Sequence, residues 1–238
     1  MKVKVGCCGF PIKRGSYVKQ FNVVEIQQTF YQLPQPGTVR RWREEFPPEF
    51  EFTLKVWQLI THQPSSPTYR RLKRPIPEAL KKNYGFFKPT DEVYQAWEET
   101  EAVADILQTT VIVFQTPPSF APTAEHMENM RSFFRQIDRK SYSLVWEPRG
   151  EWREAEVRAL CKEMNLIPCL DPFQAKPVAA EIGYLRLHGK GGYSYRYTDA
   201  DLTFLKEKWT SSETNYFLFN NLSMYEDALR FQKCCSIQ

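Results

Sequence analysis

Polar and ionisable residues follow most of the short apolar stretches of this 238-residue sequence, and they are the residues that could do chemistry. Where parallel strands end at one edge of a sheet, side chains that follow them meet, and enzymes built on such sheets place their reacting groups there. The residues at these positions are Glu25, Lys55, His62, Gln115, Glu147, Arg149, Asp171, Arg186, His188, Asn220 and Asn221.

Three kinds of chemistry fit these residue types. Glu25 and Glu147 could form a general acid/base pair, with one pKa raised by burial and neighbouring charge. Alternatively, Lys55, Arg149 and Arg186 could neutralise the acids in a buried ion network that only holds the edge together. A mixed nitrogen and oxygen site for a divalent metal ion is the third alternative. Its ligands would come from Glu25, His62, Glu147, Asp171 and His188.

His188 is the most informative of the three histidines. It leaves an apolar stretch just before Gly189, Gly191 and Gly192, where a flexible backbone can approach a ligand closely. A histidine that only bonds a neighbouring strand end is the alternative. Asn220 and Asn221 each offer an amide donor and acceptor, which suits the positioning of a polar ligand.

The elements that must position these residues are short β-branched and aromatic stretches that alternate with helical patterns. The helical patterns cover residues 91–108, 123–138 and 154–165, and the capping-box spacings at Thr198 and Ser223 begin two more helices. The predicted strands are residues 3–7, 23–26, 51–56, 110–115, 143–146, 167–170, 184–187 and 216–219.

Eight strands that alternate with helices predict an α/β, TIM-barrel-like (β/α)8 fold. We find no repeat or Gly/Ser linker that would divide the chain, so residues 1–238 are predicted to form a single domain. The Pro-rich stretch at residues 63–77 and the basic stretch that follows to residue 88 are too long for an ordinary strand–helix connection. They predict a long excursion after the third strand.

This excursion is also the one concentrated basic segment of the sequence. Basic residues interleaved with Tyr69, Tyr84, Phe86 and Phe87 are the pattern expected for single-stranded nucleic acid, with the aromatic rings as stacking surfaces. A solvated surface is the alternative. The basic residues that would contact nucleic acid are Arg70, Arg71, Lys73, Arg74, Lys81 and Lys82.

Charge and composition exclude few further classes of function. Lys and Arg number 32 and Asp and Glu 28, and this net charge of +4 is too small to indicate nucleic acid by itself. No apolar run approaches a membrane span or a signal peptide. The six cysteines form no CxxC pair, so we expect reduced thiols, a cytoplasmic location and no membrane partner.

Several stretches together resemble the DUF72 family, also called the YecE-like family. They are Val5 to Phe10 (VGCCGF), Val24 to Tyr31 (VEIQQTFY), Phe52 to Val56 (FTLKV) with Ile60 to His62 (ITH), Phe114 to Phe120 (FQTPPSF), Trp146 to Arg149 (WEPR) with Trp152, Leu185 to Gly189 (LRLHG) and Phe217 to Asn221 (FLFNN). They occur in the family's order along nearly the whole chain. The resemblance implies a TIM-barrel-like fold and a site at the strand ends, whereas the family name itself denotes unknown function. Cys7 and Cys8 stand where the family usually has Thr-Ser.

The convergence of ionisable groups favours an enzyme, a hydrolase or isomerase that acts on a phosphorylated, polyol-like or nucleotide-like substrate. Glu25 and Glu147 would be the acid/base pair, and His188 would shuttle a proton because its reference pKa lies near neutrality. A non-catalytic nucleic-acid-binding protein and a small-molecule binder are the alternatives. The predicted substrate-binding residues are Lys55, His62, Gln115, Arg149, Asp171, Arg186, Asn220 and Asn221.

Overall fold

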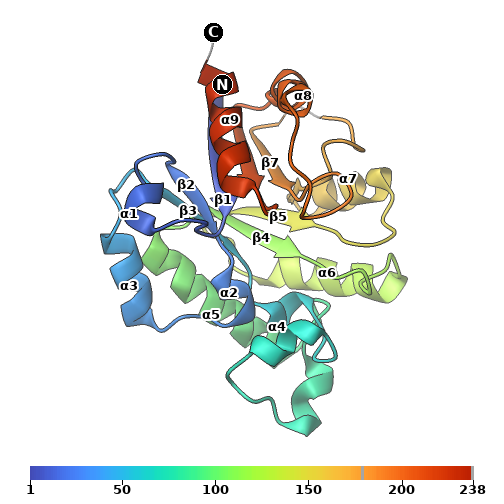
Figure 1. Ribbon diagram of the computed structural model, residues 1–238. Helices are drawn as coiled ribbons and strands as arrows, with labels where there is room; N and C mark the ends of the chain where they lie inside the picture. Colours follow the sequence, from blue (N-terminus) through green and yellow to red (C-terminus); the bar gives the residue numbers. More distant parts are fainter. Residues whose placement is uncertain (178–179, 237–238) are drawn as a thin grey trace. The chain divides into compact units, whose positions relative to one another are not determined.

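A computed structural model describes residues 1–177 and 180–236 (Figure 1). All eight predicted strands are present, and β1 with β2 and β8, β3 with β4, β4 with β5, β5 with β6, and β7 with β8 form parallel pairs. The sheet order is β6-β5-β4-β3-β2-β1-β8-β7. The strands are β1 (Lys2–Cys8), β2 (Val23–Ile26), β3 (Glu51–Lys55), β4 (Val111–Gln115), β5 (Ser143–Glu147), β6 (Ile167–Pro168), β7 (Ile182–Leu187) and β8 (Thr214–Phe219).

The alternating helices complete an α/β, TIM-barrel-like fold, as predicted. The α-helices are α1 (Arg14–Tyr17), α2 (Gln28–Tyr31), α3 (Pro36–Glu44), α4 (Gln58–Thr61), α5 (Asp91–Leu107), α6 (Ala124–Gln136), α7 (Glu154–Glu163), α8 (Asp199–Trp209) and α9 (Met224–Ser236). Two 3-10 helices, η1 (Pro67–Arg71) and η2 (Glu78–Asn83), lie between α4 and α5.

Local sequence explains several of these boundaries. The predicted capping box begins α8, because Thr198 accepts from the backbone N–H of Asp201 and the Asp201 carboxylate accepts from that of Thr198. Helix α9 begins directly after Ser223, as its spacing predicts. Strand β6 is two residues shorter than predicted and ends at Pro168, which has no N–H to donate to a neighbouring strand.

The described residues divide into two compact units that interleave along the chain. The first unit contains residues 1–25, 46–51, 169–177 and 180–236, and the second contains residues 26–45 and 52–168. The prediction that residues 1–238 form a single domain stays a prediction.

In the first unit β1 lies between β2 and β8, and β8 also pairs with β7. Helix α9 packs on β1 and β8 (Figure 1). The Tyr17 hydroxyl accepts the N–H of Cys7 at 2.8 Å and donates to the carbonyl of Val23 at 2.9 Å, which ties α1 to two strands.

All six cysteines lie among the described residues and are free thiols, and burial raises the pKa of Cys7 to about 12.

In the second unit β4 lies between β3 and β5, and β5 pairs with β6. Helices α3 and α5 pack against each other. An aromatic core joins the excursion to β4 and α6, because Phe87 contacts Phe114, Phe133 and Phe134.

The predicted excursion after the third strand is confirmed, and it returns to α4 at its far end. Gly85 donates to the carbonyl of Leu59 at 2.8 Å, and Phe87 donates to that of Ile60 at 2.9 Å. Gly85 has a φ of +80°, and a Cβ there would lie 2.4 Å from the carbonyl oxygen of His62. Only glycine fits this approach, so the excursion holds the backbone beside His62 in place.

No helix in the described part of the chain is both long enough and apolar enough to cross a membrane. The cytoplasmic location stays a prediction.

Candidate active site

Three neighbouring strand ends of the second unit carry Lys55, Gln115 and Glu147. Gln115 pairs in register with Glu147, and Lys55 pairs with Val113, two residues before Gln115. Residues paired in register, and residues two apart on a strand, face the same side of a sheet. The three polar side chains therefore share one face, and the Lys55 ammonium donates to the Gln115 amide oxygen.

Glu147 is paired with a cation that reaches solvent. Its Oε1 lies 2.9 Å from Nη2 of Arg149, and the side chains are 6% and 34% exposed. Arg149 follows Glu147 by two residues in the loop after β5, so this pairing is local in sequence. The half-exposed guanidinium connects the buried carboxylate to solvent.

Aromatic packing holds Lys55 in place. Its ammonium nitrogen lies 3.5 Å from the centre of the Phe30 ring, a cation–π contact. The hydroxyl of Thr29 donates to the Lys55 carbonyl at 2.7 Å. The two residues of the Thr-Phe-Tyr stretch after β2 thus position both the backbone and the charge of Lys55.

His62 belongs to the same group of side chains. Its ring packs edge-on against Phe30 at 4.8 Å, and its Nδ1 lies 2.8 Å from the Thr61 hydroxyl. Burial, with a smaller contribution from the Lys55 charge, lowers the pKa of His62 to about 3. The imidazole is therefore neutral at neutral pH, which suits hydrogen bonding but not proton exchange.

In the first unit, Glu25 and Arg186 form a fully buried ion pair. Arg186 Nη2 lies 2.9 Å from Oε1 of Glu25, and Nε lies 3.0 and 3.1 Å from the two carboxylate oxygens. The Tyr184 hydroxyl donates to the same carboxylate at 2.8 Å. The side chains of Glu25 and Arg186 are 0% and 1% exposed. For this pair the geometry favours the alternative of a structural ion network.

The remaining predicted residues of the first unit have separate roles. His188 Nδ1 lies 3.0 Å from the Asn220 amide nitrogen, and the half-exposed His188 ring packs edge-on against Tyr193. Asn221 points inward instead, since its amide donates to the carbonyl of Tyr195 and to Asp227.

Asp171 is exposed, and its carboxylate accepts from the backbone N–H of Phe173 at 3.0 Å and from the Gln174 amide at 2.8 Å. The carboxylate therefore caps its own turn.

The structure brings together Lys55, Gln115, His62, Glu147 and Arg149 within the second unit, and Glu25 with Arg186, and His188 with Asn220, within the first. The predicted pairing of Glu25 with Glu147 stays a prediction. Among residues 1–177 and 180–236, no three His, Cys, Asp or Glu residues are grouped so that they could hold a metal ion.

The basic segment is exposed, but its rings are not all available. Arg70, Arg71, Lys73, Arg74, Lys81 and Lys82 are all exposed. Phe86 and Phe87 are only 4% and 0% exposed, because the excursion folds back on α4 and the aromatic core. Their predicted role as stacking surfaces is therefore wrong, and nucleic-acid binding by the basic residues stays a prediction.

Sequence reasoning gave no role in the site to Tyr184 and Phe30. Tyr184 lies two residues before Arg186 on β7, so the two-residue alternation of a strand could have placed both on one face. Phe30 belongs to the stretch that carries the family resemblance, but nothing in the sequence links its ring to Lys55.

The buried neutral His62 predicts a specific loss of stability in acid. Between pH 6.5 and about 3 the unfolded chain binds a proton at this histidine that the folded protein does not, so the free energy of unfolding falls as pH falls. This group alone should remove about 2 kcal/mol between pH 7 and 5. Urea unfolding should show a shallower pH dependence for His62→Gln over that range, whereas parallel curves for variant and wild type would exclude the assignment.

The chain matches a known protein family over almost its whole length. Residues 14–236 match the family described as "Protein of unknown function DUF72". The curated relatives are UPF0759 protein YecE of Escherichia coli strains K12 and O157:H7, each 45% identical over 47 residues. That match covers 20% of this chain, and the chain spans only 17% of the length of these curated relatives.

Two solved structures share the fold over nearly their full lengths. A DUF72 family protein from Thermotoga maritima is 19% identical, with a TM-score of 0.71 over 99% of this chain and 100% of that one. A DUF72 family protein from Enterococcus faecalis is 16% identical, with a TM-score of 0.75 over 99% of this chain and 96% of that one. At these identities the likeness shows the fold alone. The match over residues 14–236 shows the family: the chain belongs to DUF72.

Proposed function

We propose that this protein is an enzyme, a hydrolase or isomerase, that acts on a phosphorylated, polyol-like or nucleotide-like substrate at the strand ends of the second unit. One observation carries the proposal: a buried carboxylate, Glu147, shares one face of the sheet with Lys55 and pairs with the half-exposed Arg149. TIM-barrel enzymes place their catalytic residues at these carboxyl ends.

In this proposal Glu147 is the general base. If the protein is an isomerase, the Glu147 carboxylate removes a proton from the substrate carbon next to a carbonyl, and negative charge moves onto the carbonyl oxygen. If the protein is a hydrolase, the Glu147 carboxylate removes a proton from the attacking water. In both cases the protonated Glu147 then returns the proton, to a neighbouring carbon or to the leaving group.

Arg149 and Lys55 supply the positive charge that such a substrate requires. The Arg149 guanidinium binds a phosphate or carboxylate through two parallel hydrogen bonds. The Lys55 ammonium stabilises the oxygen on which charge develops. Gln115 and the neutral His62 contribute hydrogen bonds that orient the substrate without changing its charge.

The charged residues of the first unit are not part of this assignment. Because Glu25 is completely buried and bound by Arg186 and Tyr184, it maintains the structure of its own unit in this proposal. The role of His188 as a proton shuttle stays a prediction, and Asn220 orients its ring.

Substitution of Glu147 tests the catalytic assignment. Thermal melts with glucose 6-phosphate, AMP, xylitol and inorganic phosphate identify the compounds that stabilise the folded protein. Reaction of each stabilising compound is then followed by NMR. Glu147→Gln should retain the thermal shift but lower the turnover by roughly a hundredfold to ten-thousandfold, because only proton transfer is lost.

Arg149→Gln is the matched variant. It should weaken the shift by the phosphorylated compounds more than the shift by xylitol, since it removes a charge and not the base. Turnover by Glu147→Gln at the wild-type rate would refute the proposal, and so would equal weakening of all shifts by Arg149→Gln.

Nucleic-acid binding is the second candidate, and a specific observation favours it. A pocket of about 370 Å³ in the excursion is lined by Lys81, Lys82 and Lys88. Contacts between lysines and phosphates release counterions, so binding of a single-stranded oligonucleotide should weaken steeply between about 50 and 200 mM salt. Fluorescence anisotropy would measure this, and binding that does not respond to salt would exclude this candidate.

A further inference from the structure

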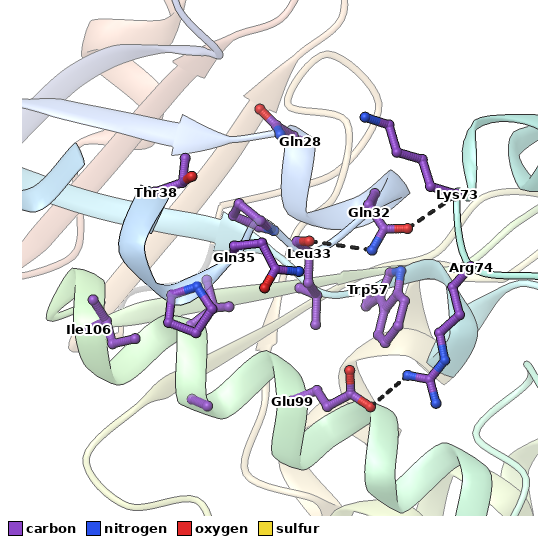
Figure 2. Close-up of a pocket in the computed structure, with 14 residues that line it drawn as sticks. Gln28, Gln32, Leu33, Gln35, Thr38, Trp57, Lys73, Arg74, Glu99 and Ile106 are labelled. Atoms are coloured by element: carbon purple, nitrogen blue, oxygen red, sulfur yellow. Dashed lines mark hydrogen bonds and ion pairs between the residues drawn. The ribbon is translucent and has the colours of Figure 1, made fainter. Parts of the chain in front are cut away.

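A second pocket, separate from the proposed catalytic residues, lies beside helices α3 and α5 of the second unit. This α3–α5 pocket has a volume of about 670 Å³ (Figure 2). It is lined by Gln28, Gln32 to Pro36, Thr38, Trp57, Lys73 and Arg74, and by Glu99, Ala102, Val103 and Ile106 of α5. Pockets of about 300–1,000 Å³ are the size that small organic ligands occupy. Neither Glu147, Arg149 nor Lys55 lines it.

The pocket contains a hydrogen-bond donor that lacks an acceptor. Trp57 is 1% exposed, and its indole N–H has no partner among the described residues. An unpaired buried donor destabilises a protein, so an acceptor that reaches it is favoured. By contrast, the indoles of Trp146, Trp152 and Trp209 donate to Thr116, Phe120 and Pro172.

The neighbouring amide is already engaged elsewhere. In the view of Figure 2 the indole nitrogen of Trp57 lies on the side that faces Gln32. Gln32 accepts from the backbone N–H of Lys73 at 3.1 Å and donates to the carbonyl of Leu33 at 3.3 Å. The second of these bonds is long and therefore weak, so an incoming acceptor can displace it and reach the indole.

The charges at the rim favour an anion. Arg74 pairs with Glu99 at 2.9 Å, so these two charges largely compensate each other. Lys73 is exposed and adds one positive charge on the same side as Gln32. One net positive charge matches a single carboxylate better than a doubly charged phosphate.

Part of the pocket wall is apolar, because Leu33, Pro34, Pro36, Val103 and Ile106 line the pocket. Such walls bind the hydrocarbon part of a ligand through burial of apolar surface. The pocket thus combines a cationic end with an apolar body.

We infer that the α3–α5 pocket binds a small organic carboxylate with an apolar ring or chain. The carboxylate lies against the Lys73 ammonium and accepts the indole N–H of Trp57 after the Gln32 side chain turns aside. The apolar body lies between Leu33 and Val103. Because this site shares no residue with the catalytic assignment, it stands whether or not that assignment holds.

NMR of the indole N–H groups tests this inference on the full chain. Protein labelled with ¹⁵N at its six tryptophans gives one indole signal for each, and Trp57→Phe and Trp97→Phe assign two of them. Trp97 is the matched control, because its indole is also buried and without a partner in the described structure but does not line the pocket. Benzoate or indole-3-acetate should shift the Trp57 signal in a saturable way and leave the Trp97 signal unchanged.

Affinity measurements on variants complete the test. By isothermal titration calorimetry, Trp57→Phe should weaken benzoate binding by roughly tenfold, because it keeps the ring and removes the donor. Lys73→Met changes only an exposed residue and should weaken binding by about two- to fivefold. Inorganic phosphate should not shift the Trp57 signal.

Three NMR results would overturn the inference. They are a Trp57 signal that neither carboxylate shifts, equal shifts of the Trp57 and Trp97 signals, and a shift by phosphate as large as that by benzoate. Unchanged affinity in Lys73→Met would overturn it as well, and this holds even if Trp57→Phe does not fold.

Discussion

A charged side chain can be buried at the end of a strand only where an opposite charge or several hydrogen bonds meet it, because desolvation of an isolated ion costs several kcal/mol. Both units of this protein place charges at strand ends under that constraint. In the first unit Arg186 and Tyr184 bind the Glu25 carboxylate, whose side chain is fully buried. In the second unit Arg149 meets Glu147 but remains about one-third exposed. The same requirement is thus met by a closed arrangement in one unit and by an open one in the other.

This difference assigns the two glutamates different roles. A carboxylate enclosed by a guanidinium and a phenol fixes the relative positions of β2 and β7, and removal of one partner would leave a buried charge. A carboxylate whose partner reaches solvent can exchange that partner for a ligand. Lys55 is an intermediate case, since a ring face and an amide oxygen surround its ammonium. Both contacts orient the ammonium toward the face that Gln115 and Glu147 share.

The sequence predicted the fold and the identity of the strand-end residues well, since apolar runs that end in a polar residue are visible without any tertiary information. The sequence did not predict which basic residue pairs with each glutamate. Glu25 and Arg186 are 161 residues apart, and only the order and register of the strands bring them together.

The excursion shows the same limit in another way. Basic and aromatic residues alternate in its sequence as on a binding surface, yet the backbone bonds of Gly85 and Phe87 to α4 turn Phe86 and Phe87 into the core. The unpaired indole of Trp57 is likewise invisible in the sequence, because whether a buried donor finds an acceptor depends on packing. Local patterns thus reveal elements and candidate residues, whereas tertiary packing decides which of them are accessible.

In this proposal the Glu25–Arg186 pair maintains the structure, whereas the Glu147–Arg149 pair is available for chemistry. Double-mutant cycles on the free energy of unfolding distinguish these two roles, with Glu25→Gln and Arg186→Met in one cycle and Glu147→Gln and Arg149→Met in the other. We expect a coupling energy of about 2–3 kcal/mol for the enclosed pair and below about 1 kcal/mol for the open pair. Equal coupling energies, or a larger one for Glu147 and Arg149, would contradict this proposal.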